Sequence, residues 1–332
     1  MLSDSTTSTR TATATMRAAV IAGPRQSEIE HRTIPEPGPD EVRIRLEGCG
    51  VCSSSLPLWE GRPWFEYPTE AGTPGHEGWG LIDAIGPRVT GLQLGDRVAA
   101  LSYRAYAEYD IAAAGAVVPL PENLAGRFFP GEPLGCAINI FRRSDIQAGH
   151  TVVIIGIGFL GALLTRLATR AGARVIAISR RPFALDLARE LGADVAIPLD
   201  DHHRIVSQVQ KLTGGEGAER VIEAVGSQWP LDLATDLARV RGRLVIAGYH
   251  QDGPRQVNMQ LWNWRGLDVI NAHERDPNVY VDGIRGAVEA VSSGILNPAG
   301  LYTHTFPLDE LGQAFEIMRD RPDGFLKALV LT

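Results

Sequence analysis

The sequence predicts an α/β protein of about two domains, one of them built on a doubly wound parallel sheet. Three observations support this prediction. The chain has 332 residues, enough for two domains of ~100 to 200 residues each. Short strand patterns separated by Gly and Pro fill the first third, and from Gly149 onwards strand patterns alternate with helical ones. Strands that alternate with helices are typical of a parallel sheet covered on both faces.

The composition excludes several classes of protein. Hydrophobic residues make up 44% and charged residues 21% of the chain, which is ordinary for a globular protein and excludes wholesale disorder. No apolar run reaches the ~18 residues that span a bilayer, so we expect a soluble protein without a membrane partner. The net charge of -7, without a basic stripe, argues against nucleic acid as a partner. Three cysteines are too few for a disulfide framework and indicate a reducing, cytoplasmic compartment.

The first part of the chain predicts a β-rich domain that follows a tail. Residues 1–15 are rich in Ser and Thr and lack the apolar segment of a secretory signal, so we expect a disordered tail. A strand pattern begins at Met16, and Glu41–Leu46 alternates polar and apolar residues as a half-buried strand does. Further strand patterns, separated by Gly and Pro turns, are GWGLIDAIG, GDRVAAL, AEYDIA and AVVPLP.

The clearest strand-turn-helix unit begins at Thr151. Thr151–Ile155 is a β-branched run, typical of a strand that is buried on both faces of a parallel sheet. Leucines and alanines at helical spacing follow the next turn, and Gly172 stands where a helix C′ residue is expected. Comparable patterns predict strands over 174–178, 195–197, 221–225, 244–247 and 325–331 and helices over 182–191, 203–212, 230–240, 282–293 and 308–319.

The turn after this first buried strand carries a dinucleotide-binding fingerprint, Gly156-Ile157-Gly158-Phe159-Leu160-Gly161. The first Gly allows the turn, the second lets the backbone approach a pyrophosphate, and the third lets helix and strand pack closely. The N-terminus of the following helix then faces the phosphates. Such a motif also arises in ordinary strand-to-helix turns, but the strand before it and the helix after it favour a Rossmann domain.

The end of the second strand selects the cofactor. The segment Ile178-Ser179-Arg180-Arg181-Pro182 lacks the Asp or Glu that bonds the ribose 2′-hydroxyl of NAD. Ser179, Arg180 and Arg181 instead suit a 2′-phosphate, which a guanidinium can bind with its planar fork. We therefore expect NADP(H) rather than NAD(H). In the alternative interpretation both arginines only solvate the start of a helix, although the helix dipole disfavours cations there.

Two loops of the β-rich domain carry residue types that bind metals. They are Gly48-Cys49-Gly50-Val51-Cys52 and Gly75-His76-Glu77-Gly78. A Cys-x-x-Cys pair can be redox-active, but that motif normally opens a helix in a βαβ unit, whereas three serines and Pro57 follow it here. Thiol redox chemistry is therefore disfavoured.

In combination these motifs resemble those of the zinc-type medium-chain dehydrogenase/reductase family, the class of alcohol, sorbitol and threonine dehydrogenases. The matching segments are MRAAVIAGP, GCGVCSSS, PGHEGWG, GLIDAIG, LGDRVA, GEPLGCA, GIGFLG and KALVL. The resemblance covers residues 16 to 332. It implies a GroES-like catalytic domain over 16–148 and 286–332, with a Rossmann dinucleotide-binding domain over 149–285 between them.

The resemblance also implies one catalytic zinc. In the family the second Cys of the first loop and the His of GHE are ligands, so Cys52 and His76 inherit these roles. The third ligand lies 24 residues before the first Gly of the dinucleotide loop, which is Glu132. Glu77 is the alternate fourth ligand, and Cys136 is a rival third ligand. A thiolate, an imidazole and a carboxylate leave one tetrahedral position open for substrate, as catalytic zinc requires.

The chain departs from the family pattern around this site. Ser55 stands where an Asp normally orients the ligating His, and losing such a partner costs ~10- to 100-fold in metal affinity or activity. Ser54 takes the place of the hydroxyl of the proton relay, but Pro57 stands where some members have a relay His. The four-cysteine lobe that binds a structural zinc is also absent from the sequence.

The implied activity is reversible hydride transfer between NADP(H) and an alcohol, ketone or aldehyde, with polyols, sugars and cyclitols among the candidates. Zinc would act as the Lewis acid, and Ser54 would accept the hydroxyl proton. Two alternatives remain: an NADPH-dependent reductase of an alkene, iminium or quinone without catalytic zinc, and a non-catalytic NADPH-binding protein. Glu223 and Lys327 are interpreted as strand-edge and surface residues rather than catalytic ones.

Two further expectations concern surfaces. The aromatic residues between the metal-binding loops either line the substrate pocket or fill the core; they are Trp59, Trp64, Phe65 and Tyr67. Leu267–Asn271 is expected to be an exposed edge strand, which favours pairing across a two-fold axis. We therefore expect a homodimer or homotetramer.

Overall fold

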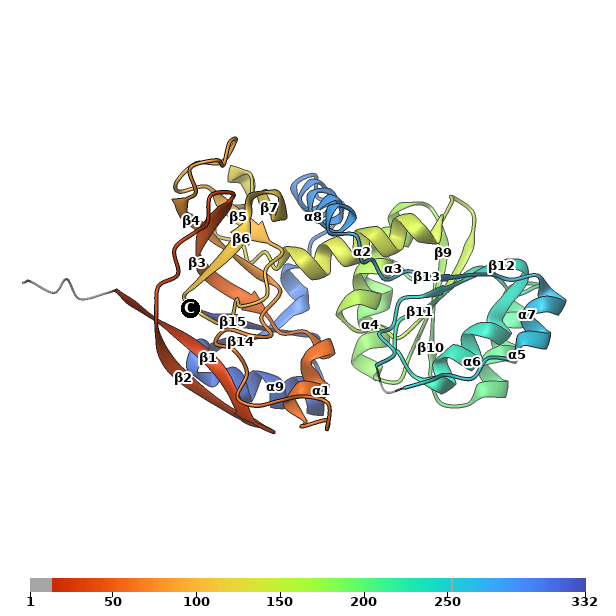
Figure 1. Cartoon of the computed structure of the whole chain (residues 1–332). Coiled ribbons are helices and arrows are strands. Elements are labelled where there is room, and N and C mark those ends of the chain that lie inside the picture. Colours follow the sequence, from red (N-terminus) through yellow and green to blue (C-terminus); the bar gives the residue numbers. More distant parts are fainter. Residues whose placement is uncertain (1–13, 252) are drawn as a thin grey trace, which may run out of the picture.

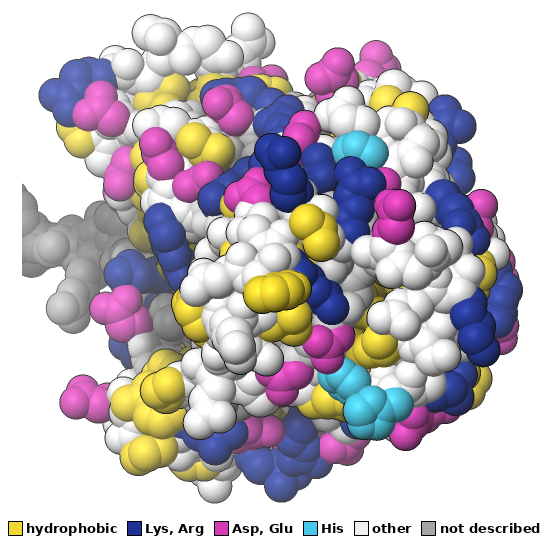
Figure 2. Space-filling model, turned by 90° about the vertical axis from the view of Figure 1, so that its right-hand side faces the viewer, with side chains coloured by type: hydrophobic (Ala, Val, Ile, Leu, Met, Phe, Trp, Pro, Cys, Tyr) yellow, Lys and Arg dark blue, Asp and Glu magenta, His cyan; other side chains and the backbone are white. Residues whose placement is uncertain are grey.

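The computed structural model describes residues 14–251 and 253–332 and consists of two lobes joined by helices (Figure 1). The predicted tail over residues 1–15 lies outside the described residues except for its last two, and Thr15 already begins the first strand. Among the described residues, no helix is long and apolar enough to cross a bilayer. Figure 2 shows acidic and basic side chains interspersed over the face on the Rossmann side.

The Rossmann lobe is a six-stranded parallel sheet with the strand order β10-β9-β8-β11-β12-β13. Its strands are β8 (Thr151–Ile155), β9 (Arg174–Ser179), β10 (Val195–Pro198), β11 (Ala218–Glu223), β12 (Ala238–Ile246) and β13 (Asp268–Asn271). Its helices are α3 (Phe159–Arg170), α4 (Pro182–Glu190), α5 (His202–Leu212), α6 (Gln228–Leu237) and α7 (Met259–Arg265). The order reverses between β8 and β11, which is the switch point where doubly wound sheets bind ligands.

Burial in this lobe follows the predicted pattern. Residues 152–155 of β8 are completely buried, and they alternate between the two hydrophobic clusters on opposite faces of the sheet. Gly172 has a φ of +80° just after α3, so the helix ends as predicted. β13 lies at the edge of the sheet, as expected for Leu267–Asn271.

Two predicted boundaries in the lobe are wrong. The helix expected over 230–240 ends at Leu237, because Ala238 is extended and pairs with Ala218 of β11. The strand expected over 221–225 ends at Glu223, whose carboxylate accepts hydrogen bonds from the backbone N–H groups of the two residues that begin the turn. Helix α7 was not predicted.

The β-rich lobe contains a seven-stranded sheet and a separate two-stranded ladder. The path of the sheet is β14-β15-β3-β4-β5-β7, with β6 paired to β3, and β1 pairs with β2. The strands are β1 (Thr15–Gly23), β2 (Gln26–Thr33), β3 (Glu41–Gly50), β4 (Gly78–Ile85), β5 (Arg97–Ala100), β6 (Tyr109–Ala113), β7 (Val117–Pro119), β14 (Tyr302–Pro307) and β15 (Lys327–Leu331). Helices α1 (Leu56–Trp59) and α9 (Leu311–Asp320) complete the lobe. β2 and β14 were not predicted, because both are largely exposed and lack an apolar pattern.

Helices α2 (Gly131–Ser144) and α8 (Pro277–Ser292) lie side by side at the junction of the lobes (Figure 1). α2 was not predicted as a helix because Pro133 and Gly135 interrupt its pattern, although proline is tolerated in a first turn. The predicted domain boundaries at 149 and 286 fall after α2 and within α8.

Candidate active site

The dinucleotide loop has the geometry that its three glycines predict. Gly156 has a φ of +97°, which favours glycine. A Cβ at Gly161 would lie 1.9 Å from the carbonyl oxygen of Gly156, whereas a Cβ at Gly158 would meet nothing within 4 Å. Helix α3 begins at Phe159 without a side-chain cap, so its first N–H groups are open to a phosphate. The loop therefore fits a dinucleotide pyrophosphate.

Arginines gather at the end of β9. Arg180 is exposed and forms no hydrogen bond or ion pair within the described part of the chain, whereas Arg181 is half-buried and donates to the carbonyl of Phe325 in the other lobe. Burial and the nearby charge of Arg321 lower the pKa of Arg181, and burial and the charge of Arg180 lower the pKa of Arg321. Ser179 is buried at the end of the strand. The sequence did not point to Arg321, which follows α9.

The two metal-binding loops meet because strands β3 and β4 pair. Cys49 of β3 is opposite Gly78 of β4, so the residues after β3 and before β4 lie side by side. Ligand atoms of Cys52, His76 and Glu77 all lie within 4.8 Å of one another. A thiolate, an imidazole and a carboxylate form a donor set that suits zinc. The structure thus brings together three of the four predicted ligands.

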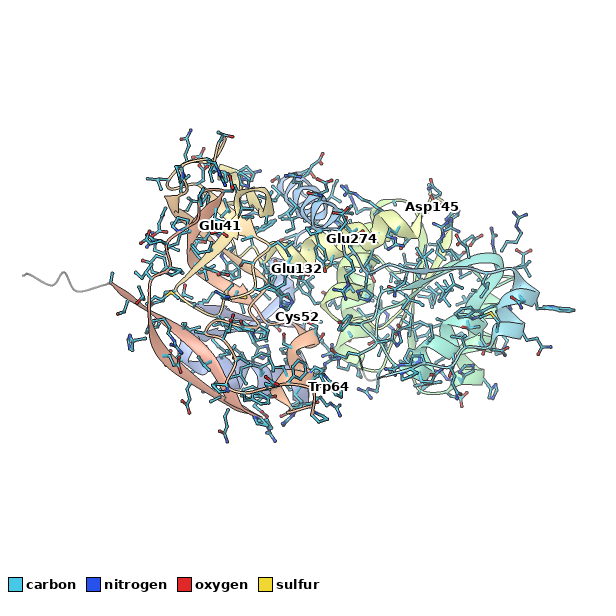
Figure 3. All side chains as sticks on the ribbon, in the orientation of Figure 1. Glu41, Cys52, Trp64, Glu132, Asp145 and Glu274 are labelled. Atoms are coloured by element: carbon cyan, nitrogen blue, oxygen red, sulfur yellow. The ribbon has the colours of Figure 1, made fainter. Side chains whose placement is uncertain are left out.

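Glu132, the remaining predicted ligand, is buried in the first turn of α2. Figure 3 shows Glu132 and Cys52 on the part of the β-rich lobe that faces the Rossmann lobe. Burial raises the pKa of Glu132, while the charge of His76 opposes this shift. Oε1 of Glu132 accepts a hydrogen bond from Cys136, with a sulfur–oxygen distance of 3.3 Å. Glu132 therefore lies beside the cluster of Cys52, His76 and Glu77. The thiol next to it belongs to Cys136, the residue that the sequence offers as a rival third ligand.

A backbone carbonyl orients His76. Nδ1 of the ring lies 2.8 Å from the carbonyl oxygen of Pro74, which can only accept, so Nδ1 carries the proton and Nε2 is left for a metal. This contact holds the ring of His76 in its orientation. Burial lowers the pKa of His76, but the hydrogen bond and charge of Cys52, together with nearby carboxylates, raise it to about 10.

Lys327 is buried, so its predicted surface position is wrong. Its Nζ lies 2.6 Å from Oε1 of Glu77 and 5.3 Å from the centre of the Phe159 ring in the dinucleotide loop. The pattern KALVL predicts a strand correctly but cannot reveal a buried acid 250 residues away. Lys327 therefore connects the metal-binding loop with the dinucleotide loop.

Glu223 ends β11 and is completely buried. Its Oε1 accepts hydrogen bonds from the N–H groups of Val225 and Gly226, and its Oε2 lies 2.9 Å from Nε2 of His250. These contacts give Glu223 a structural task in holding the loop after β11.

The hydroxyl of Ser54 lies beside the metal-binding cluster. Its Oγ donates to Sγ of Cys52 over 3.2 Å, so it is close enough to act on a group bound there. Of the aromatic residues in question, Trp59 belongs to the core and stacks on Phe315 with ring centres 5.1 Å apart. Trp64 is 60% exposed and does not fill core.

Known proteins are similar to this chain in sequence. The sequence model of the alcohol dehydrogenase GroES-like domain matches residues 38–122, and that of zinc-binding dehydrogenases matches residues 160–285. An alcohol dehydrogenase of Cupriavidus necator is 25% identical over 96% of this chain and 99% of its own. The sorbitol dehydrogenase of Rattus norvegicus is 27% identical over 90% of this chain and 91% of its own.

A solved structure is similar over the same length. It is that of a proposed zinc-binding dehydrogenase from Sinorhizobium meliloti bound to NADP. Its sequence is 25% identical, the match covers 96% of this chain and 100% of that chain, and the TM-score is 0.81.

Proposed function

Since the chain is an oxidoreductase that belongs to the zinc-type medium-chain dehydrogenase/reductase family, we propose that it transfers hydride between NADP(H) and an alcohol or the corresponding ketone or aldehyde. One observation carries this proposal. The cluster of Cys52, His76 and Glu77 is connected to the dinucleotide loop by Lys327, whose Nζ contacts Glu77 and the ring of Phe159. The residues that would hold the metal and the loop that would hold the cofactor thus belong to one site.

We assign a single zinc to Cys52, His76 and Glu132, with Glu77 as the alternate ligand. When bound, zinc supplies Lewis-acid chemistry that stabilises an alkoxide or polarises a carbonyl. The protein's own groups do the rest. Pro74 fixes the tautomer of His76.

Ser54 is assigned the proton transfer. Its hydroxyl, 3.2 Å from the sulfur of Cys52, would accept the proton of the substrate hydroxyl in oxidation while it releases its own proton, and the reverse transfer would take place in reduction. Pro57 offers no group to continue a relay, so water would take up the proton that Ser54 releases.

We assign the 2′-phosphate of NADP(H) to the arginines at the end of β9. Arg180 is exposed and has no acidic partner among the described residues, and Arg321 lies close enough to lower the pKa of its neighbour. A dianionic phosphate would relieve the mutual repulsion of these guanidinium groups. Comparable Kd values for NADH and NADPH would contradict this assignment.

The competing proposal is a reductase of an alkene, iminium or quinone that works without catalytic zinc. Ser55, in place of the orienting Asp, favours it. The expectation of a non-catalytic NADPH-binding protein is not retained, because the chain belongs to a family of enzymes.

A metal analysis combined with a substrate screen tests the proposal. The purified protein should contain one zinc per subunit and oxidise NADPH with ketones, aldehydes, sugars or cyclitol ketones. Removal of zinc with a chelator should abolish turnover, and added zinc should restore it. Full turnover by the metal-free protein would favour the reductase.

We also propose that the chain forms a homodimer or homotetramer through β13. This strand ends the sheet, and Trp264 in the preceding helix α7 is 85% exposed. Sedimentation equilibrium should give a multiple of the 35.9 kDa chain, and a monomer at micromolar concentration would refute the proposal.

A further inference from the structure

Three polar groups from two helices form a chain that ends at Glu132. Sγ of Cys136 lies 3.3 Å from Oε1 of Glu132, one turn earlier on α2, and 3.4 Å from the hydroxyl of Tyr280 on α8. A thiol has one proton, and an ionised carboxylate can only accept it. The thiol therefore donates to Glu132, and the hydroxyl of Tyr280 donates to the sulfur and to Glu132 itself.

Close packing of the two helices lets Tyr280 reach this position. A Cβ at Gly135 would lie 2.7 Å from a backbone nitrogen of α8, and a Cβ at Gly283 would lie 2.7 Å from the carbonyl oxygen of Gly135. The side chain of Asn139 donates to the carbonyl of Val279 over 2.9 Å. These contacts fix the backbone beside Tyr280 against α2.

We propose that Tyr280 is a positioning residue for the metal site: its hydroxyl, together with the thiol of Cys136, holds Oε1 of Glu132 so that Oε2 is left for zinc. The inference rests on the proposed assignment of Glu132 as a ligand. Two of the proposed ligands then have an orienting partner: the carbonyl of Pro74 orients His76, and Tyr280 with Cys136 orients Glu132. Ser55 has no carboxylate to do this.

Tyr280→Phe tests the role because it removes only the hydroxyl. The affinity of the full-length protein for zinc, measured by competition with a chromophoric chelator, should fall by about 10-fold, the lower end of the range for lost partners of metal ligands. Tyr109→Phe is the matched control. Tyr109 is on β6, its ring packs under Arg43 of β3, and the change likewise removes only a hydroxyl. It should leave the zinc affinity unchanged.

A spectrum separates positioning from simple loss of packing. The ligand-field bands of the cobalt-substituted protein report the geometry around the metal, and Tyr280→Phe should shift them. Equal zinc affinity and unchanged bands in this variant would overturn the inference. A failure of the proposed function would give a different result. In that case the wild-type protein would contain no zinc, or its zinc content would not fall in Cys52→Ser.

Cys136 supplies a second test. Cys136→Ala should also weaken zinc binding, and the double variant should lose less than the sum of the two single losses, because both groups hold the same carboxylate. Additive losses would overturn the inference. Loss of a thiolate-to-cobalt charge-transfer band in Cys136→Ala would also overturn it, by making Cys136 itself the ligand.

Discussion

The dinucleotide loop and the metal-binding cluster are built in different ways. The loop is made by the backbone of one short segment, in which glycines provide the turn, the open approach and the close packing. The cluster is made by side chains from two separate loops, which carry Cys52 and Glu77, and Lys327 contacts it from a third segment far along the sequence. A site made by the backbone is disrupted by substitutions that add atoms, whereas a site made by side chains is disrupted by substitutions that remove one of the interacting groups.

Loss of a ligand should have the largest effect. Cys52→Ala removes a proposed zinc ligand, and the Lewis acid is worth several kcal/mol of transition-state stabilisation, so turnover should fall by at least ~10³-fold together with zinc content. Cys49→Ala is the matched control: Cys49 is buried and its thiol donates to the carbonyl of Gly50. This control should keep its zinc, and loss of zinc from both variants would mean that the two cysteines act together.

Breaking the pair between Lys327 and Glu77 should have the next largest effect. Lys327→Met leaves the completely buried Glu77 without its cation, and removing one partner of a buried pair costs about 3 to 5 kcal/mol. Urea denaturation followed by circular dichroism measures this change in the free energy of unfolding. Lys327→Arg keeps the charge and should recover most of the loss; equal losses would show that packing, not charge, matters here.

The same pair predicts a pH dependence. Burial lowers the pKa of Lys327, but the charge of Glu77 and other nearby acids raise it overall above the ordinary value of 10.5. The folded state therefore holds this proton more tightly than the unfolded state. The stabilisation is complete below pH 10.5 and disappears as the pH rises through the raised pKa. Lys327→Met should lack this share of the alkaline loss of stability.

Substitution of two glycines of the loop should affect different properties, the stability in one case and the cofactor binding in the other. Gly161→Ala forces a Cβ to within 1.9 Å of the carbonyl of Gly156, and overpacking of this kind costs about 1 to 3 kcal/mol in stability. Gly158→Ala adds a Cβ that meets nothing within 4 Å, so it should leave the Tm unchanged but weaken NADPH binding where the backbone approaches the pyrophosphate. A loss of stability in Gly158→Ala would contradict this division of tasks.

These contrasts also explain what could be predicted from the sequence. The fold of the Rossmann lobe and the loop GIGFLG were predictable because their physics is local: periodic burial in β8 and glycines at fixed offsets. The family resemblance supplied Cys52, His76 and Glu132. The groups that contact the candidate ligands could not be found. Pro74 contacts His76 through its backbone carbonyl, and Tyr280 and Lys327 reach Cys136 and Glu77 only through packing between distant segments.

Arg321 provides the smallest and most selective test. If its guanidinium binds the 2′-phosphate, side chains from both lobes contribute to the NADP(H) site. That site would then depend partly on side chains from distant segments, as the metal-binding cluster does. Arg321→Ala should then raise the Kd of NADPH by about 10-fold, roughly 1.4 kcal/mol for one charge-assisted contact at an exposed position, and leave the Kd of NADH unchanged. Arg319→Ala is the control, because Arg319 pairs with Glu316 and Asp320. Equal changes for the two cofactors would instead place the effect of Arg321 in the contact between the lobes, where Arg181 already binds the carbonyl of Phe325.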